Sequence, residues 1–347
     1  MVPFAGYNMP VQYQGLKIEH QAVREHVGMF DVGHMGEFMV EGPDAEKLIQ
    51  WISSNDASTL EDGKVQYSCM PNATGGIVDD MLVYRLASDR FMLVVNASNR
   101  DKDWNWVQEQ VTLHAWDARV RDESDRYALL AVQGPNAQNM VGRLGPARAD
   151  GLPWSELAYY TFTLGKLMGH EVILSATGYT GSGGLEIYMP MEAADSVWDA
   201  LLAEGAVPCG LGARDTLRME MGYCLYGNDL SDNTSPISAG LGWITKFTKD
   251  FVAKATLQHE KAQGPSTKLV GLVMDERGIP RQDYVVKNAD GAVVGKVTSG
   301  TMSPSLGHGI GMAYIDASHA QPGTSLLVEI RNKSLACHVV RFPFYKG

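Results

Sequence analysis

The spacing of apolar residues divides the chain into two regions. Over residues 1–260, segments with helical spacing, such as residues 17–27, are mixed with short β-prone apolar runs, such as residues 91–95. After a polar stretch with Gly and Pro at residues 261–267, helical spacing disappears and short β-prone runs separated by turn residues remain. The pattern predicts an α+β region, a linker, and a small closed or sandwiched β-domain over residues 268–347.

Two adjacent carboxylates stand in residues 75–86, GGIVDDMLVYRL, between a glycine pair and an apolar run. Successive strand side chains point to opposite faces, so one of Asp79 and Asp80 can look into a pocket while the other faces solvent or caps the turn. An Asp-rich turn before an ordinary strand explains the same residues. The next apolar run predicts a hairpin, and Asn96 at its far end either binds a heterocyclic ligand or caps the following helix.

Charged residues also interrupt two other apolar segments. Glu186 lies between Leu185 and Ile187, so it is either on a solvent face or buried with a partner. Burial without a partner would cost several kcal/mol or raise its pKa. Arg214 and Arg218 lie one turn apart in a predicted apolar helix, where they need acidic partners inside the protein or a ligand carboxylate.

Composition narrows the classes of function. A chain of 347 residues favours two or three domains. The formal net charge of −11 argues against a general nucleic-acid binder, because phosphate contacts need clustered Lys and Arg. The cysteines are scattered singly, without CxxC or zinc-ligand spacing, so neither a disulfide framework nor a metal site is expected. A soluble protein with a small-molecule or protein partner fits these features.

The sequence also predicts where the protein works. No apolar run approaches the roughly 18 residues that span a bilayer, and the N-terminus lacks a signal-type segment. We therefore expect no membrane attachment and a cytoplasmic location, although a processed mitochondrial matrix protein would look the same. Because the chain opens in motif-like sequence at MVPFAG, we expect a few residues upstream.

Six stretches, taken in order, closely resemble the aminomethyltransferase (T-protein) family of the glycine cleavage system: MVPFAGYNMPVQY, FDVGHMGEF, GGIVDDMLVYRL, GYTGSGGLEIY, GLGARDTLRMEMGYCLYGND and VTSGTMSPSLG. The resemblance covers nearly the whole chain. It implies a three-domain, cloverleaf-like folate-binding fold. Two interleaved α+β domains would fill residues 1–260, and a C-terminal β-barrel would fill residues 268–347.

The resemblance also implies the activity. The one-carbon unit of an aminomethyl group, carried on the dihydrolipoyl arm of the H-protein, would pass to tetrahydrofolate. The products would be 5,10-methylenetetrahydrofolate, ammonia and the reduced lipoyl arm. Tetrahydrofolate would be a cosubstrate, no metal would be needed, and we expect a monomer.

By position in the family motif, Asp80 would be the catalytic carboxylate and Asp79 its outward or capping neighbour. Attack by a folate nitrogen on a methylene iminium carbon passes through positive charge. A fixed carboxylate can stabilise that charge or accept the proton.

The remaining site residues would bind folate. A carboxylate accepts both donors of the pterin amide and amino group, which would explain Glu186 in an apolar strand. The other family positions carry Arg214, Tyr67, Tyr84, Asn96, Tyr179, Arg281 and Tyr345. Ser182 stands where the family usually has an acidic residue, so folate affinity or the order of this loop would differ slightly.

Two relatives would share the scaffold. The folate-binding part of sarcosine and dimethylglycine dehydrogenases is fused to a flavin domain, but this sequence has no GxGxxG segment. Iron–sulfur-cluster assembly factors carry a Lys-Gly-Cys segment where this chain has GYCLYG at residues 222–227. The transferase is therefore favoured, and a non-enzymatic folate-binding protein is the competing interpretation.

Overall fold

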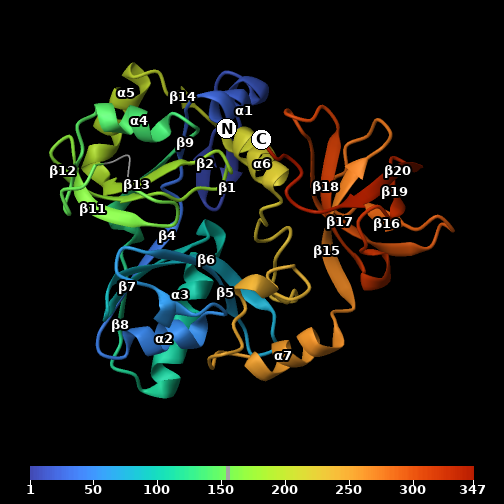
Figure 1. Ribbon diagram of the computed structural model, residues 1–347, viewed down its shortest axis with the longest axis horizontal. Coiled ribbons are helices and arrows are strands. Elements are labelled where there is room, and N and C mark those ends of the chain that lie inside the picture. The colour runs from blue at the N-terminus through green and yellow to red at the C-terminus, as the bar shows by residue number, and fades with distance from the viewer. Residues whose placement is uncertain (154–156) are drawn as a thin grey trace. The chain divides into compact units, whose positions relative to one another are not determined.

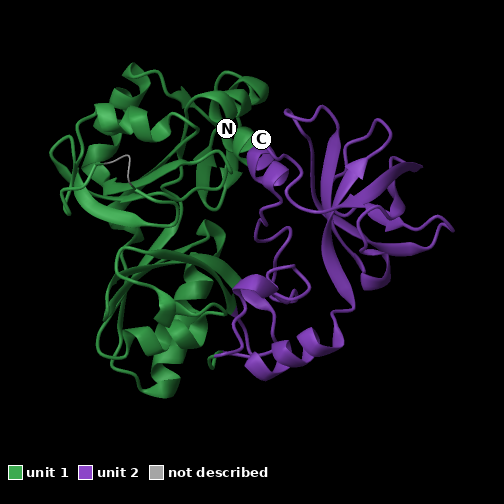
Figure 2. Ribbon diagram, in the orientation of Figure 1, with its two compact units in different colours: residues 1–70, 79–214, 249–251 green, residues 71–78, 215–248, 252–347 purple. Residues whose placement is uncertain are grey.

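The computed structural model describes residues 1–153 and 157–347 (Figure 1). These residues form two compact units that interleave along the sequence (Figure 2). Unit 1 consists of residues 1–70, 79–214 and 249–251, and unit 2 of residues 71–78, 215–248 and 252–347.

The larger sheet of unit 1 is mostly antiparallel, with β14 pairing parallel to β3. Leu185 and Ile187 belong to a buried core that also contains Val141 of α4 (Ala137–Arg143) and Val197 of α5 (Ala194–Ala203). In sheet order the strands are β10 (Ala147–Arg148), β11 (Phe162–Leu167), β12 (His170–Ser175), β13 (Gly184–Pro190), β9 (Tyr127–Gln133), β3 (Gly28–Asp31) and β14 (Val207–Pro208).

The smaller sheet carries the carboxylate pair. Its strands, in order, are β5 (Val65–Pro71), β6 (Ile77–Ala87), β7 (Arg90–Val95), β4 (Gly36–Glu41) and β8 (Arg119–Asp122). Phe38 of β4 packs edge-on against Trp104 of α3 (Arg100–His114), which places α3 on one face of the sheet. The predicted hairpin is confirmed by the pairing of β6 with β7.

A buried carboxylate fastens the N-terminal segment of unit 1, which includes β1 (Val2–Phe4) and β2 (Tyr7–Met9). Glu19 of α1 (Leu16–Glu25) accepts backbone N–H bonds from residues 13–15 with Oε1 and from Gly210 with Oε2. Gly210 directly precedes α6 (Leu211–Met221), so one side chain holds the chain start and the entry to α6 together.

Unit 2 contains a closed antiparallel barrel. Its interior is filled by alternate apolar side chains, such as Leu272, Val297 and Val339. The predicted class, α+β with a C-terminal β-barrel, is confirmed. Around the barrel the order is β15 (Thr267–Met274), β18 (Gly309–Asp316), β17 (Val293–Met302), β16 (Val285–Lys287), β19 (Ser325–Ile330) and β20 (Lys333–Val340).

The helix predicted at residues 17–27 agrees with α1 to within a few residues, and α3 is the helix predicted after Asn96. Unit 1 also contains α2 (Ala45–Ile52). The predicted linker at residues 261–267 is partly wrong, because α7 (Lys254–Gln263) occupies its first residues and β15 begins at its last. None of the helices in the described ranges has the length and apolar character that crossing a membrane requires. Short 3-10 helices cover Ala57–Thr59, Ala97–Asn99, Ser124–Arg126, Met191–Ala193, Gly242–Ile244 and Ala317–His319.

Candidate active site

The two carboxylates of β6 face opposite sides of the smaller sheet. Asp79 is fully buried and accepts hydrogen bonds from the Asn96 backbone N–H at 2.8 Å, Asn96 Nδ2 at 2.9 Å and Asn99 Nδ2 at 2.6 Å. Asp80 is half-buried and accepts from Tyr67 Oη at 2.8 Å and from Asn96 Nδ2 at 2.9 Å. A solvent-facing Asp79 is therefore wrong, because donors at the start of the α3 segment draw its carboxylate inward.

Asn96 joins the two carboxylates instead of capping a helix. It occupies the N-cap position of the 3-10 turn that leads into α3, yet its side chain makes no capping bond there. Its amide group donates to Asp79 and to both the carboxylate and the backbone carbonyl of Asp80. The capping alternative is wrong, because two anionic oxygens are stronger acceptors for this amide group than a cap offers.

The environment of Asp80 suits a group that exchanges protons near neutral pH. Burial and the negative charge of Asp79 raise the pKa of Asp80 to about 7, against the opposing hydrogen bonds from Tyr67 and Asn96. A carboxyl with this pKa is available both as a carboxylate and as an acid in the neutral range.

Glu186 is on the side of β13 opposite Leu185 and Ile187, and it is half-buried. Thr177 Oγ1 lies 2.5 Å from Glu186 Oε2 and donates to it. Burial raises the pKa of Glu186, while the Thr177 hydrogen bond and the positive charge of Arg214 act in the opposite direction. The solvent-face alternative is wrong: the carboxylate is sheltered and has partners.

Tyr84 is fully buried behind Glu186. Its hydroxyl lies 3.0 Å from Ser175 Oγ, 3.0 Å from Tyr188 Oη and 3.3 Å from Thr177 Oγ1. Thr177 in turn holds Glu186, so Tyr84 reaches the site through a hydroxyl network rather than through an exposed ring face. Because Tyr84 and Asp80 lie four residues apart on β6, they share one face of the sheet.

Arg214 and Tyr179, two further residues predicted to bind folate, contact each other. The Arg214 guanidinium carbon lies 4.4 Å from the centre of the Tyr179 ring, a cation–π contact. The positive charge of Arg214 acts to lower the pKa of His34 as well as that of Glu186. Burial and Arg214 lower the pKa of His34 to about 3, so this imidazole is neutral in the physiological range.

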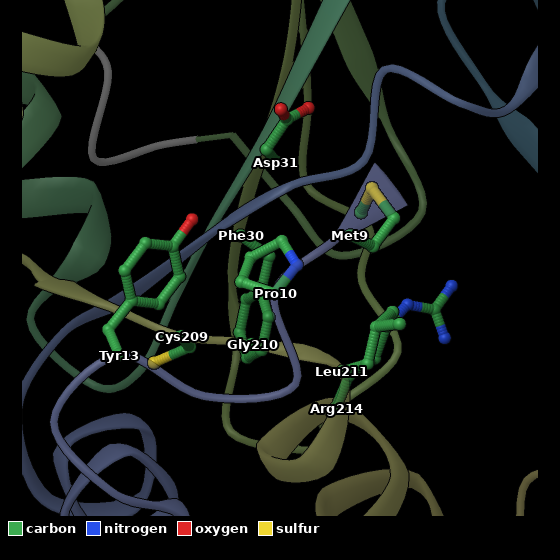
Figure 3. Close-up of a pocket in the computed structure, with 9 residues that line it drawn as sticks. All are labelled: Met9, Pro10, Tyr13, Phe30, Asp31, Cys209, Gly210, Leu211 and Arg214. Atoms are coloured by element: carbon green, nitrogen blue, oxygen red, sulfur yellow. The ribbon is translucent and has the colours of Figure 1, made fainter. Parts of the chain in front are cut away.

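A small pocket adjoins Arg214 in unit 1 (Figure 3). Figure 3 shows the Arg214 guanidinium directed away from the other labelled side chains. Asp80 and Glu186 do not line this pocket, so it adjoins the predicted site without accounting for it. The lining residues are Met9, Pro10, Tyr13, Phe30, Asp31, Cys209, Gly210, Leu211 and Arg214.

Two predicted folate-binding residues belong to unit 2. Arg281 is exposed and donates to the Gly300 carbonyl at 3.1 Å. Tyr345 is half-buried, and its backbone N–H donates to the Glu220 carbonyl at 3.0 Å. In the described part of the chain, no three His, Cys, Asp or Glu side chains gather as metal ligands would.

Sequence reasoning missed Thr177 and Asn99 as partners of the two predicted carboxylates. From the sequence, Asn99 is expected only near the start of the helix that follows Asn96. Its position three residues after Asn96 could have indicated that both amides lie near the turn that faces Asp79. Thr177 carries no comparable signal, because its contact with Glu186 joins two different segments of the larger sheet.

Comparison with known proteins finds two family models that together match most of the chain. The family model described as "GCVT N-terminal domain" matches residues 1–249, and "Glycine cleavage T-protein C-terminal barrel domain" matches residues 267–346. The chain belongs to the glycine cleavage T-protein family.

Relatives of this T-protein-family chain match along its full length. It is 51% identical to an aminomethyltransferase of Flavobacterium psychrophilum, over 100% of this chain and 95% of that protein. It is 47% identical to an aminomethyltransferase of Halothermothrix orenii, over 99% of this chain and 95% of that protein. The crystal structure of the glycine cleavage system aminomethyltransferase T from Bartonella henselae superimposes with a TM-score of 0.91 at 33% identity, covering 99% of this chain and 93% of that one.

Proposed function

We infer that the protein is an aminomethyltransferase of the glycine cleavage system. It transfers the one-carbon unit of the aminomethyl group on dihydrolipoyl H-protein to tetrahydrofolate, with release of ammonia. The observation that carries this inference is the match of the whole chain, at about half identity, to curated aminomethyltransferases. Tetrahydrofolate supplies the nitrogen that accepts the one-carbon unit.

Asp80 is the proposed catalytic carboxylate. A half-buried carboxyl with a pKa near 7, fixed by Tyr67 and Asn96, can take up a proton or stabilise a nearby positive charge without moving. Tyr67 and Asn96 are proposed to hold this carboxylate in place, and both remain candidates for direct contact with folate.

Glu186 is the proposed acceptor for the pterin donor pair. Its sheltered position supports this role, because a charged hydrogen bond gains strength away from water. Arg214 balances its charge, and the Tyr179 ring next to Arg214 offers an aromatic face. For Tyr84 the hydroxyl network supports a role through Thr177. Folate binding by Arg281 and Tyr345 rests on the sequence resemblance.

The domain boundaries, 1–260 and 268–347, remain proposals alongside these roles. The absence of a metal requirement, a monomeric state and a cytoplasmic location also remain predictions from the sequence. Light scattering after size exclusion tests the monomer directly.

The deciding experiment measures ammonia release from aminomethylated, lipoylated H-protein with and without tetrahydrofolate. We expect release that depends on both this protein and folate, with matching formation of methylenetetrahydrofolate. Binding of tetrahydrofolate without ammonia release above background would favour the non-enzymatic folate-binding protein instead.

A further inference from the structure

A third carboxyl group lies beside the pair on β6. Asp103, in the first turn of α3, is fully buried. Within residues 1–153 and 157–347, no N–H or hydroxyl group donates to either of its oxygens. Its neighbour is Asp79, whose carboxyl group is within hydrogen-bonding range. A hydrogen bond between two carboxyl groups requires a proton on one of them.

The neighbours of each group decide which one holds that proton. Asp79 already accepts three N–H bonds, from Asn96 and Asn99, and these favour its ionised form. Asp103 has no such donors, so its ionised form would be buried without compensation. Burial and the charge of Asp79 raise the pKa of Asp103 to about 11. The first turn of α3 favours a nearby negative charge, and Asp79 supplies it.

The hydrogen bonds of Asp79 connect Asp103 to Asp80, the proposed catalytic residue. Asp79 accepts hydrogen bonds from the Asn96 backbone N–H and from Asn96 Nδ2, and the same Nδ2 donates to Asp80 at 2.9 Å. We propose that Asp103 is a positioning residue: its proton, shared with Asp79, keeps Asp79 in place as an acceptor and thereby fixes the Asn96 amide against Asp80. This role rests on the proposed function of Asp80.

A neutral Asp103 also limits the charge around Asp80. The titratable or charged groups that act on this cluster are Asp79 and Asp80 on β6, Tyr67 and Cys69 on β5, and Lys102 beside Asp103 on α3. When Asp103 is protonated, it adds no negative charge to those of Asp79 and Asp80. An ionised Asp103 would raise the pKa of Asp80 further, so that less of Asp80 would be in the carboxylate form at neutral pH.

The experiment compares Asp103→Asn with Asp103→Leu in the full-length protein. The Asn side chain keeps the shape, the neutrality and a donor toward Asp79, whereas the Leu side chain keeps only the branched arrangement of heavy atoms and has neither a donor nor an acceptor. Asp101→Asn is the matched control, because Asp101 is an exposed acid in the same helical turn. Turnover, the KM for tetrahydrofolate and folate binding are measured for each variant.

We expect Asp103→Asn to keep turnover within about twofold of wild type. Asp103→Leu should lower kcat about 100-fold, the loss expected for a misplaced catalytic group, with little change in folate affinity. Equal losses in both variants would overturn the proposal, because an anionic Asp103 would then be required. A folded Asp103→Leu protein with wild-type kcat would also overturn it.

A second measurement needs neither catalysis nor the folding of the Leu variant. At about pH 9, between the pKa values of Asp80 and Asp103, infrared spectra of the free protein should show the carbonyl band of a protonated acid. Burial also raises the pKa of Glu37, so this carboxyl can contribute to the same band. One component of the band should therefore be lost in Asp103→Asn, whereas the whole band should be retained in Asp101→Asn. If wild type shows the Asp103 component of the band but releases no ammonia, the proposed function is contradicted and the shared proton is supported. If wild type and Asp103→Asn give equal spectra, the proposal about Asp103 is overturned.

Discussion

At the scale of single residues, two neighbours in sequence differ because their surroundings differ. Asp79 faces α3 and is enclosed by amide donors, so both its oxygens serve the fold. Asp80 faces the other side, is half-buried, and has one tyrosine and one amide partner. The identical side chains therefore have separable functions, which substitution can test.

Asp80→Asn should reduce turnover roughly 100- to 10,000-fold, the range for removing a group that moves or stabilises a proton. Folate binding should fall only modestly, because the shape is kept and the charge is removed. Stopped-flow or steady-state ammonia release, together with a folate titration, measures the two effects.

Asp79→Asn is the matched comparison. An amide has one oxygen where Asp79 uses two, so an Asn96 or Asn99 donor loses its acceptor at a cost of about 1–3 kcal/mol in the free energy of unfolding. Urea denaturation measures this loss. A larger loss of turnover in folded Asp79→Asn than in Asp80→Asn would reverse the assignment.

The pH dependence of Asp80 should have opposite signs for stability and activity. Its pKa of about 7 lies above the roughly 3.9 of an unfolded chain, so protonated Asp80 favours the folded state. That contribution to stability is complete below about pH 4 and is lost as the pH rises through 7. Turnover, which needs the carboxylate, should increase as the pH passes 7.

Melting temperatures and turnover of wild type and Asp80→Asn, recorded from about pH 5 to about pH 8.5, test this. The stability difference between the two proteins should move against wild type as the pH rises. Parallel melting curves would show that Asp80 titrates as it does in the unfolded chain.

At the scale of elements, local pattern predicted most helices and strands, because a helix or a half-buried strand shows its period in the sequence. The pattern did not reveal what the polar side chains bind. Asp79 lies near the start of β6 and Asn96 follows the end of β7, 17 residues later, while Thr177 and Glu186 lie in different segments. Such contacts depend on strand register, which short apolar runs leave undetermined. The apolar pattern drew attention to the carboxylate pair and to Glu186, whereas the family resemblance chose Asp80 over Asp79 and assigned the roles.

The Glu19 contacts on α1 give a prediction at this scale. Glu19→Ala removes the acceptor of backbone N–H groups at residues 13–15 and at Gly210, all in buried or partly buried positions. We expect a loss of about 3 kcal/mol in the free energy of unfolding, and a higher KM for folate because Gly210 leads into the helix of Arg214.

Denaturant titration and folate-dependent kinetics measure both effects. Glu25→Ala, an exposed change on the same helix, should stay within about 0.5 kcal/mol of wild type. Comparable losses in the two variants would mean that the helix charge, and not the backbone contacts, carries the stabilisation.

At the scale of the whole molecule, the predicted division at residue 260 cuts the sequence once, whereas each compact unit combines several separate segments of the sequence. Short β-prone runs separated by turn residues predicted a β-domain, and the β15–β20 pairing closes it into a barrel. Unit 2 also takes in residues 71–78 and 215–248. Within it, Tyr226 Oη donates to the Ile77 carbonyl at 2.9 Å, and Ile77 N–H donates to the Ser231 carbonyl at 3.1 Å. No local period encodes such long-range pairing.

Substitutions in a buried ion pair of unit 2 can measure how strongly residues 215–248 are held in that unit. Arg218 and Asp229 are both buried, with Arg218 Nη1 donating to Asp229 Oδ2 at 2.8 Å, and Ser299 and Thr298 also donate to Asp229. Asp229→Ala removes the buried carboxylate that pairs with the Arg218 guanidinium and leaves the partly exposed Asp215 as its acidic partner. We therefore expect unit 2 to lose about 3–5 kcal/mol of stability in calorimetry or urea denaturation. In an Arg218→Met background the same change should cost clearly less, because no charge is left behind. Equal costs in both backgrounds would show that Asp229 stabilises unit 2 through its other donors, which are Ser299, Thr298 and the Leu225 backbone N–H. Arg218, which was predicted to need an internal acidic partner, would then not depend on Asp229.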